Sequence, residues 1–474
     1  MQRKLSTAVL LALLPPIFSA QEPAQPAPQL REAWVGELEI GPMRVVMQFR
    51  ILDLPDGGTQ AYFDSISENR RDMRATWSLE DGALAFDVAS IGATYRGAVD
   101  AATGSASGQF EQGGRKFSMS LQRQAMAYEN PNRWELRPQR PQAPFPYSVE
   151  EVSFPSTAPG VTLAGTLTLP AGERPHPVVV LISGSGPQDR DETFMEHKPF
   201  LVLADYLSRR GMAVLRYDDR GTAKSTGDFG AATSADFAVD VSAAMDFLQQ
   251  HAAIDPAKVG LIGHSEGGLI APMVASSRED VAYMVLLAAP GISGQDISLS
   301  QSAAMNRAAG GTEQEIEFAK DVQEQLFDTV RAAAPNQDLR SQLAITLTEQ
   351  LADLPDDLRV QVRGAFENSF STLISPWFRF FVAYDTSEAL RQVRCPVLAL
   401  NGEKDIQVLA ELNCPAIEAA LLAAGNQDFE VVRLPGLNHL FQACETGAMS
   451  EYASIPETIN PLVLERVGGW LDAR

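Results

Sequence analysis

The second half of the chain carries a serine, a histidine and a carboxylate in loops that follow strand-like runs. Together, these three groups can perform nucleophilic catalysis. Ser265 lies in Gly263-His264-Ser265-Glu266-Gly267, a G-x-S-x-G pattern. A strand-like run, residues 259–262, precedes the pattern, and a helix-compatible run, residues 269–275, follows it. Glycines on both sides of a serine permit a tight strand-to-helix turn that exposes the hydroxyl. The pattern therefore predicts a nucleophilic serine.

A serine hydroxyl is a weak nucleophile until a base accepts its proton. The chain has five histidines, and His439 alone follows the last strand-like run, residues 430–434. His264 directly precedes Ser265, so its side chain is expected to point away from the hydroxyl. We therefore predict that His439 is the base.

The carboxylate that orients the base is expected between Ser265 and His439 in the sequence. A strand-like run, residues 396–400, leads into a loop that carries Glu403 and Asp405. We assign Asp405, which lies farther along the loop, and keep Glu403 as the alternative. This carboxylate would hold the neutral tautomer of His439 and stabilise its cation.

A developing oxyanion needs two hydrogen-bond donors. The backbone N–H of Glu266, the residue after the nucleophile, is predicted as one donor. The other is expected from the glycine-rich loop of residues 183–192, with Ser185 as the candidate. A phosphate-binding loop is disfavoured because no Lys-Ser/Thr pair follows these glycines. The Glu266 side chain is expected to point into the structure and pair with an arginine.

The elements that must position these groups form a repeating pattern from about residue 147 to residue 474. Apolar strand-like runs alternate with helical stretches, which predicts an α/β domain with a doubly wound, mostly parallel sheet. The runs lie at residues 178–182, 213–217, 259–262, 283–287, 396–400 and 430–434. The long interval from about residue 292 to residue 390 contains helical periodicity but no good strand. It predicts an inserted helical cap over the end of the sheet.

Aromatic residues cluster near the end of the predicted cap. Trp377, Phe378, Phe380 and Phe381 either line an acyl pocket or form the core of the cap itself. The sequence leaves both interpretations open.

The N-terminal part has a different sequence pattern. Residues 30–125 read as a small all-β domain, with turns at Asp81-Gly82 and Gly113-Gly114, and contain no catalytic constellation. A proline-rich linker, residues 126–146, is expected to be stiff and extended. Its composition separates the two predicted domains.

The first twenty residues resemble a secretory signal peptide. Arg3 and Lys4 precede an apolar run at residues 9–18, and the small residues Ser19 and Ala20 suit cleavage. We therefore expect a secreted or periplasmic protein. The rest of the sequence has no apolar run long enough to span a membrane.

The chain has three cysteines, Cys395, Cys414 and Cys444. Export permits a disulfide between Cys414 and Cys444, and three free buried thiols are the alternative. The cysteine spacings match no metal-binding pattern. Neither a metal nor an organic cofactor is expected.

The net charge is −22 and the pI is near 4.7. This charge argues against nucleic acid and against anionic lipid surfaces as partners, since both require a basic face. A small-molecule substrate remains the expected partner.

From about residue 147 to its end, the chain resembles the alpha/beta-hydrolase superfamily and, within it, bacterial serine carboxylesterases. The resemblance rests on four motifs: SGSGPQDRDE at residues 183–192, DDRG at 218–221, GHSEGG at 263–268 and SPWFRFFVAYD at 375–385. It implies hydrolysis of esters with short or medium acyl chains through an acyl-enzyme on Ser265. Ala223 is a departure, because similar proteins often have glycine at this position.

Two other functions stay open at this stage. A serine peptidase of the prolyl-oligopeptidase type shares the catalytic fold, but the N-terminal domain is too small for a propeller and lacks blade-length repeats. A hydrolase fold that serves only as a binding module would require Ser265, Asp405 and His439 to be inert. The sequence assigns neither the oligomeric state nor the role of the N-terminal domain.

Overall fold

The computed structural model describes residues 29–40, 43–53, 58–66, 70–112, 115–124, 137–334, 337–367 and 369–474. These residues fall into two compact units, one within Pro23–Pro138 and one spanning Gln139–Arg474. The predicted signal peptide lies outside the described residues. So do residues 126–136 of the predicted linker and the predicted turn at Gly113-Gly114.

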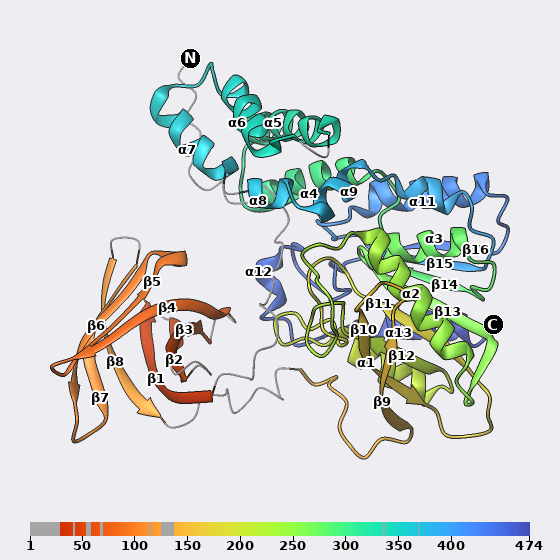
Figure 1. Cartoon of the computed structure of the whole chain (residues 1–474), viewed down its shortest axis with the longest axis horizontal. Helices are drawn as coiled ribbons and strands as arrows, with labels where there is room; N and C mark the ends of the chain where they lie inside the picture. Colours follow the sequence, from red (N-terminus) through yellow and green to blue (C-terminus); the bar gives the residue numbers. More distant parts are fainter. Residues whose placement is uncertain are drawn as a thin grey trace. The chain divides into compact units, whose positions relative to one another are not determined.

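The N-terminal unit is a closed antiparallel barrel in which each strand pairs with the next and β1 pairs with β8 (Figure 1). Its strands are β1 (Gln29–Ile40), β2 (Met43–Asp53), β3 (Thr59–Ser65), β4 (Arg70–Glu80), β5 (Ala83–Val88), β6 (Ala93–Asp100), β7 (Ser105–Gln112) and β8 (Arg115–Gln124). Asp81 and Gly82 join β4 to β5 with φ angles of 50° and 75°, as a two-residue type I′ turn requires. The predicted all-β domain is confirmed.

Aromatic side chains fill the interior of this barrel. The rings of Phe49 and Phe86 stack with centroids 4.1 Å apart, and the ring of Phe63 lies 4.9 Å from that of Phe49. An eight-stranded barrel is just wide enough for side chains to fill it. The barrel therefore has a packed core of its own.

The second unit contains an eight-stranded sheet with the order β16-β15-β14-β13-β11-β12-β10-β9. Its strands are β9 (Ser148–Pro155), β10 (Thr162–Leu169), β11 (His176–Ile182), β12 (Ala213–Tyr217), β13 (Ile254–His264), β14 (Met284–Leu287), β15 (Val397–Gly402) and β16 (Phe429–Leu434). β10 pairs antiparallel with both of its neighbours, β9 and β12, whereas the strands β11 to β16 run parallel to one another. The predicted doubly wound, mostly parallel sheet is confirmed.

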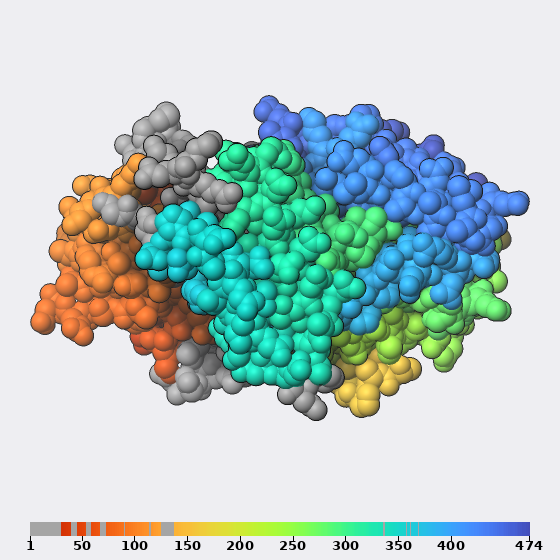
Figure 2. Space-filling model, turned by 90° about the horizontal axis from the view of Figure 1, so that it is seen from above, coloured from red at the N-terminus to blue at the C-terminus, as the bar shows by residue number. Residues whose placement is uncertain are grey.

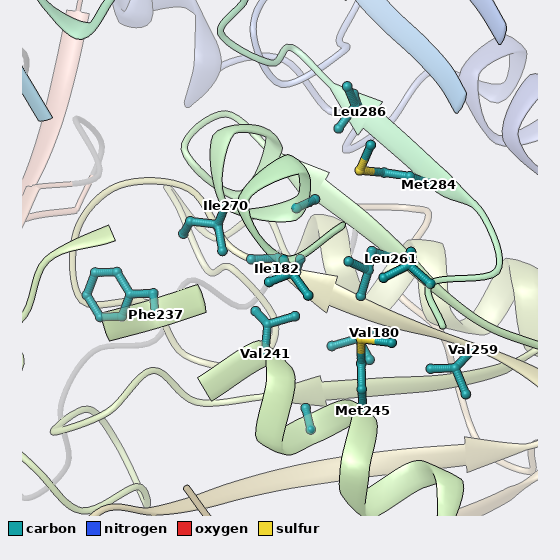
Figure 3. Packing of buried hydrophobic residues seen from close by; sticks show 14 of the residues in the cluster. Val180, Ile182, Phe237, Val241, Met245, Val259, Leu261, Ile270, Met284 and Leu286 are labelled. Atoms are coloured by element: carbon teal, nitrogen blue, oxygen red, sulfur yellow. The ribbon is translucent and has the colours of Figure 1, made fainter. Parts of the chain in front are cut away.

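Helices cover both faces of the sheet, and β11 shows why the sequence requires it. Val178, Val180 and Ile182 pack with α2 (Ser234–Gln249), α3 (Gly267–Ser277) and α11 (Ala410–Ala423). The alternate residues, Val179 and Leu181, pack with α1 (Pro199–Arg209) and α13 (Pro461–Leu471) on the opposite face. Burying such a side chain contributes about 1.5–3 kcal/mol. Figure 3 shows the α2 and α3 side of this packing, with Val241, Met245 and Ile270 over the strands.

A helical segment separates β14 from β15 in the sequence. It contains α4 (Gly294–Ala308), α5 (Glu313–Ala332), α6 (Leu339–Gln350), α7 (Asp356–Glu367), α8 (Phe370–Leu373), α9 (Pro376–Ala383) and α10 (Thr386–Leu390). Buried side chains such as Leu326, Leu343 and Phe370 form a separate core within it. From above, α5 and α6 form the green-to-cyan surface in the centre of Figure 2.

The loop after β12 contains Ala223, at a position where similar proteins often have glycine. Ala223 adopts a φ of 47°, in the left-handed region that favours glycine. The loop is held nearby by Arg220, which donates to both oxygens of buried Asp240 at 2.6 and 2.8 Å. Ala223 thus adopts a conformation that glycine would take at a lower steric cost.

All three cysteines are free, so the predicted Cys414–Cys444 disulfide is wrong. Cys414 is buried in α11, whereas the Cys444 thiol contacts the backbone oxygen of Gly436 at 3.6 Å. The two thiols therefore have separate surroundings. Among the described residues, no helix combines the length and apolar character that crossing a bilayer requires.

Candidate active site

Ser265 occupies a sharp turn between the end of β13, His264, and the start of α3, Gly267. Its φ is 51°, a strained value for a residue with a side chain. A Cβ on Gly263 would lie 2.1 Å from the backbone oxygen of Gly267, and one on Gly267 would lie 2.1 Å from that of Ile182. Only glycine fits at these two positions, which explains the G-x-S-x-G spacing physically.

His439 follows β16, and Asp405 follows the adjacent strand β15. The His439 Nδ1–H donates to Asp405 Oδ2 at 2.8 Å, and both side chains are buried. Asp405 Oδ1 also accepts the backbone N–H groups of Gln407 and Val408 at 2.8 and 2.9 Å. Because Asp405 fixes the proton on Nδ1, Nε2 is left as the acceptor that a base needs.

Glu403, the alternative acid, is exposed on the same loop. It does not line the cavity described next. The geometry therefore favours Asp405.

Ser265 and His439 line one cavity at the carboxyl edge of the parallel strands, the edge where sites occur in such sheets. The cavity encloses about 910 Å³ of space between atoms, its open mouth included. Apolar side chains form much of its wall: Phe194, Pro290, Ile297, Trp377, Phe381, Val408, Leu440 and Met449. An apolar cavity with a few convergent polar groups is typical of a small-molecule site.

The predicted oxyanion donors lie beside Ser265, since Ser185 and Glu266 both line the cavity. Within the described residues, neither backbone N–H donates a hydrogen bond. The Gly184 N–H, in contrast, is occupied by Glu192 Oε1 at 2.7 Å. Two free amides near the N-terminus of α3 are suited to stabilising an oxyanion.

The Glu266 side chain does not pair with an arginine, so this expectation is wrong. Its Oε1 accepts Ser234 Oγ–H at 2.6 Å and the Trp377 indole N–H at 2.7 Å, and Ser185 is a further hydrogen-bond partner. Complete burial raises the pKa of Glu266 above its usual value, although these hydrogen bonds oppose the shift. Neutral donors thus take the place of the expected cation.

Replacing Glu266 with glutamine is expected to make the protein more stable to heat than the wild type above neutral pH. The amide keeps an oxygen for Ser234 and Trp377 and removes the buried charge. Because the pKa of Glu266 is higher in the folded protein than in the unfolded chain, Glu266 loses its proton at a lower pH in the unfolded chain. The free energy of unfolding of the wild type therefore falls as pH rises from about 4.3, the unfolded value, through the folded pKa. The difference in Tm between variant and wild type should therefore grow with pH.

The matched control for this experiment is Glu445→Gln, because the Glu445 side chain is exposed. This control should show no pH-dependent gain in Tm. A Glu266→Gln protein that is less stable than the wild type at every pH would contradict the raised pKa.

Some residues of the aromatic cluster near the end of the helical segment line the cavity, and others belong to the core of that segment. Trp377 and Phe381 line the cavity and stack with ring centroids 5.1 Å apart. Phe378 does not line the cavity, so its assignment to the substrate pocket is wrong: it is fully buried in the core of the helical segment, 5.2 Å from Phe327. Neighbouring residues of one helix face different sides, which the sequence run alone did not resolve.

Several cavity residues were not predicted from the sequence: Gln188, Glu192, Gln301, Gln407 and Tyr452. Glu192 could have been predicted as a cavity residue, because it ends the glycine-rich motif of residues 183–192. Gln301 and Gln407 could not have been predicted, since they come from segments far apart in the sequence. Among the described residues, no group of three or more His, Cys, Asp or Glu side chains is arranged to hold a metal ion.

Comparisons with known proteins agree on hydrolases. Residues 159–414 match the family model of X-Pro dipeptidyl-peptidase (S15 family), a range that includes Ser265 and Asp405. Esterase EstD of Thermotoga maritima is 34% identical over 128 residues, which make up 27% of this chain and 30% of that protein. The chain thus matches less than a third of this curated relative's length.

Two solved structures illustrate the likeness to folds already known. The Pyrococcus furiosus esterase Pf2001 is 16% identical, with a TM-score of 0.40 over 74% of this chain and 96% of that one. Est1E from Butyrivibrio proteoclasticus, solved with ferulic acid bound, is 16% identical, with a TM-score of 0.39 over 68% of this chain and 98% of that one.

Proposed function

This chain belongs to the X-Pro dipeptidyl-peptidase (S15) family, and we propose that it is a serine hydrolase that cleaves carboxylic esters of short or medium acyl chains. The observation that carries the proposal is the buried His439–Asp405 pair, 2.8 Å long, beside a cavity that also holds Ser265 on its strained turn. The identity to esterase EstD, though partial, supports ester bonds as the target.

The reaction follows from the roles of these groups. His439 Nε2 takes the hydroxyl proton as Ser265 Oγ attacks the ester carbonyl carbon, and the resulting oxyanion is held by the N–H groups of Ser185 and Glu266. The tetrahedral intermediate collapses to an acyl-enzyme, and His439 gives its proton to the departing alcohol. Water then attacks the acyl-enzyme by the same route, releasing the acid and Ser265.

The helical segment between β14 and β15 is proposed to act as a cap. Ile297 and Gln301 of α4 and Trp377 and Phe381 of α9 contribute to the cavity wall. The Trp377–Phe381 stack and Ile297 offer an apolar surface for the acyl chain. The preference for short or medium chains rests on the resemblance to bacterial carboxylesterases, and the ester series described below tests it.

A second candidate is peptide hydrolysis, which the family model favours. An X-Pro dipeptidyl-peptidase would use the same nucleophile, base and oxyanion donors on an amide bond. We further propose that the protein is secreted or periplasmic, on the strength of the signal-like residues 1–20.

One experiment separates the two candidates. The purified protein is assayed with p-nitrophenyl esters from acetate to palmitate and with an X-Pro p-nitroanilide. Preferential turnover of the short or medium esters is expected, whereas turnover of the anilide with little ester preference would favour the peptidase. If a folded protein cleaves neither class, the proposed function is wrong.

A further inference from the structure

A buried contact connects three loops around the cavity. The His264 ring lies between Glu192 and the backbone of His439, with Nδ1 2.9 Å from Glu192 Oε1 and Nε2 3.0 Å from the His439 oxygen. The same Glu192 oxygen accepts the Gly184 N–H at 2.7 Å. Only 7% of His264 and 4% of Glu192 is exposed. The contact therefore links the nucleophile turn, the oxyanion loop and the loop of the base.

Hydrogen-bond chemistry determines the charge of this contact. A backbone oxygen only accepts, so His264 Nε2 must carry a proton, while Nδ1 faces a carboxylate. A neutral imidazole has a single N–H, so Nδ1 and Glu192 Oε1 would face each other as acceptors unless Oε1 carried a proton. Oε1 already accepts the Gly184 N–H at 2.7 Å, which favours the carboxylate form. Glu192 Oε2 has no partner among the described residues, so a proton placed there would have no acceptor. An imidazolium beside a carboxylate satisfies the geometry best.

The pKa of His264 agrees with this arrangement. Burial alone would lower the pKa, but the Glu192 carboxylate and the hydrogen bonds to Glu192 and to the His439 oxygen more than offset burial and raise it above the ordinary value. Asp405, behind His439, adds to the rise. On the other side, Asp219 lies close enough to Glu192 for their charges to interact.

Resting on the proposed function, we propose that Glu192 and His264 are positioning residues: as a charged pair they hold the loop of Ser185 and the loop of His439 in the arrangement that ester hydrolysis requires. Neither residue touches the reacting atoms in this scheme. Glu192 has a φ of 52°, a strained conformation of the kind that clusters at functional sites. A catalytic group displaced by about 1 Å can cost about a hundredfold in rate.

The test is Glu192→Gln, which keeps an oxygen for the Gly184 N–H but removes the charge. Without the carboxylate the pKa of His264 falls, so His264 becomes neutral as pH rises and loses one of its two contacts. We expect kcat to fall about 10- to 100-fold on the alkaline side, with KM little changed. At acidic pH the deficit should narrow, and Glu192→Asp should restore part of the alkaline activity.

The control is Glu445→Gln, whose side chain is exposed and is not part of the cavity lining. It should keep the wild-type pH profile. The proposal would be overturned if the dependence of kcat on pH in Glu192→Gln matched that of the wild type. It would also be overturned if kcat were lowered by the same factor at every pH, because a purely structural role would have that effect.

A second readout does not depend on ester turnover. Nuclear magnetic resonance of protein labelled with ¹⁵N in its imidazoles should show both ring protons of His264 in the wild type at neutral pH, where an ordinary histidine is mostly neutral, and only one in Glu192→Gln. If the wild type cleaves no ester but keeps both protons, the proposed function fails while the charged pair stands. If the wild type keeps only one, the charged pair is wrong whatever the activity.

Discussion

Replacing Ser265 with alanine is expected to lower kcat for a p-nitrophenyl ester by about 10⁵- to 10⁶-fold, since loss of the nucleophile in a serine hydrolase has an effect of this order. The fold should survive, because the strained φ of 51° is set by the backbone contacts of the turn and the hydroxyl is not needed to hold it. The measurement is initial-rate kinetics on protein whose circular dichroism matches the wild type.

The matched control is Ser277→Ala, which removes an exposed hydroxyl at the end of α3, the helix that follows the Ser265 turn. Its kcat should equal that of the wild type. If Ser265→Ala retained about a tenth of the wild-type rate, another group would be the nucleophile.

Asp405→Asn is expected to lower kcat by about 10⁴-fold. The asparagine amide can occupy the same space, but its NH₂ group does not accept the His439 Nδ1–H that Asp405 Oδ2 now accepts at 2.8 Å. The imidazole then adopts the other tautomer, with its proton on the nitrogen that faces the serine, and loses the carboxylate that stabilises its cation. Steady-state kinetics with an ester substrate measure the loss.

Glu403→Gln is the informative comparison, because Glu403 was the alternative acid and lies exposed on the same loop. We expect its activity to be unchanged. Should Glu403→Gln be impaired and Asp405→Asn remain active, the assignment of the acid would be reversed.

The fold was predictable wherever local sequence determines the outcome. The uninterrupted apolar run at residues 178–182 predicts a strand buried on both faces, and its alternate residues do pack against different helical layers. The order Ser265, Asp405, His439 was likewise readable, because strand–motif–helix context limits which loops meet at one edge of the sheet.

The wrong predictions concern long-range partners. The burial of Glu266 was readable, but its donors are Ser234 from α2 and Trp377 from α9, and no local pattern indicates such contacts. Phe378 and Trp377 are adjacent in sequence, yet only helix packing decides which one reaches the cavity. The role of His264 depends on Glu192, which is distant in sequence.

The most direct test of the central claim is to identify the residue that a fluorophosphonate modifies. Trypsin should release residues 259–278 as one peptide, which contains Ser265, Ser276 and Ser277. Fragmentation by mass spectrometry is expected to place the adduct on Ser265 in the wild type and to find none in His439→Ala within the same reaction time. An adduct on another serine, or no adduct on a folded wild type, would contradict the account of Ser265 as an activated nucleophile.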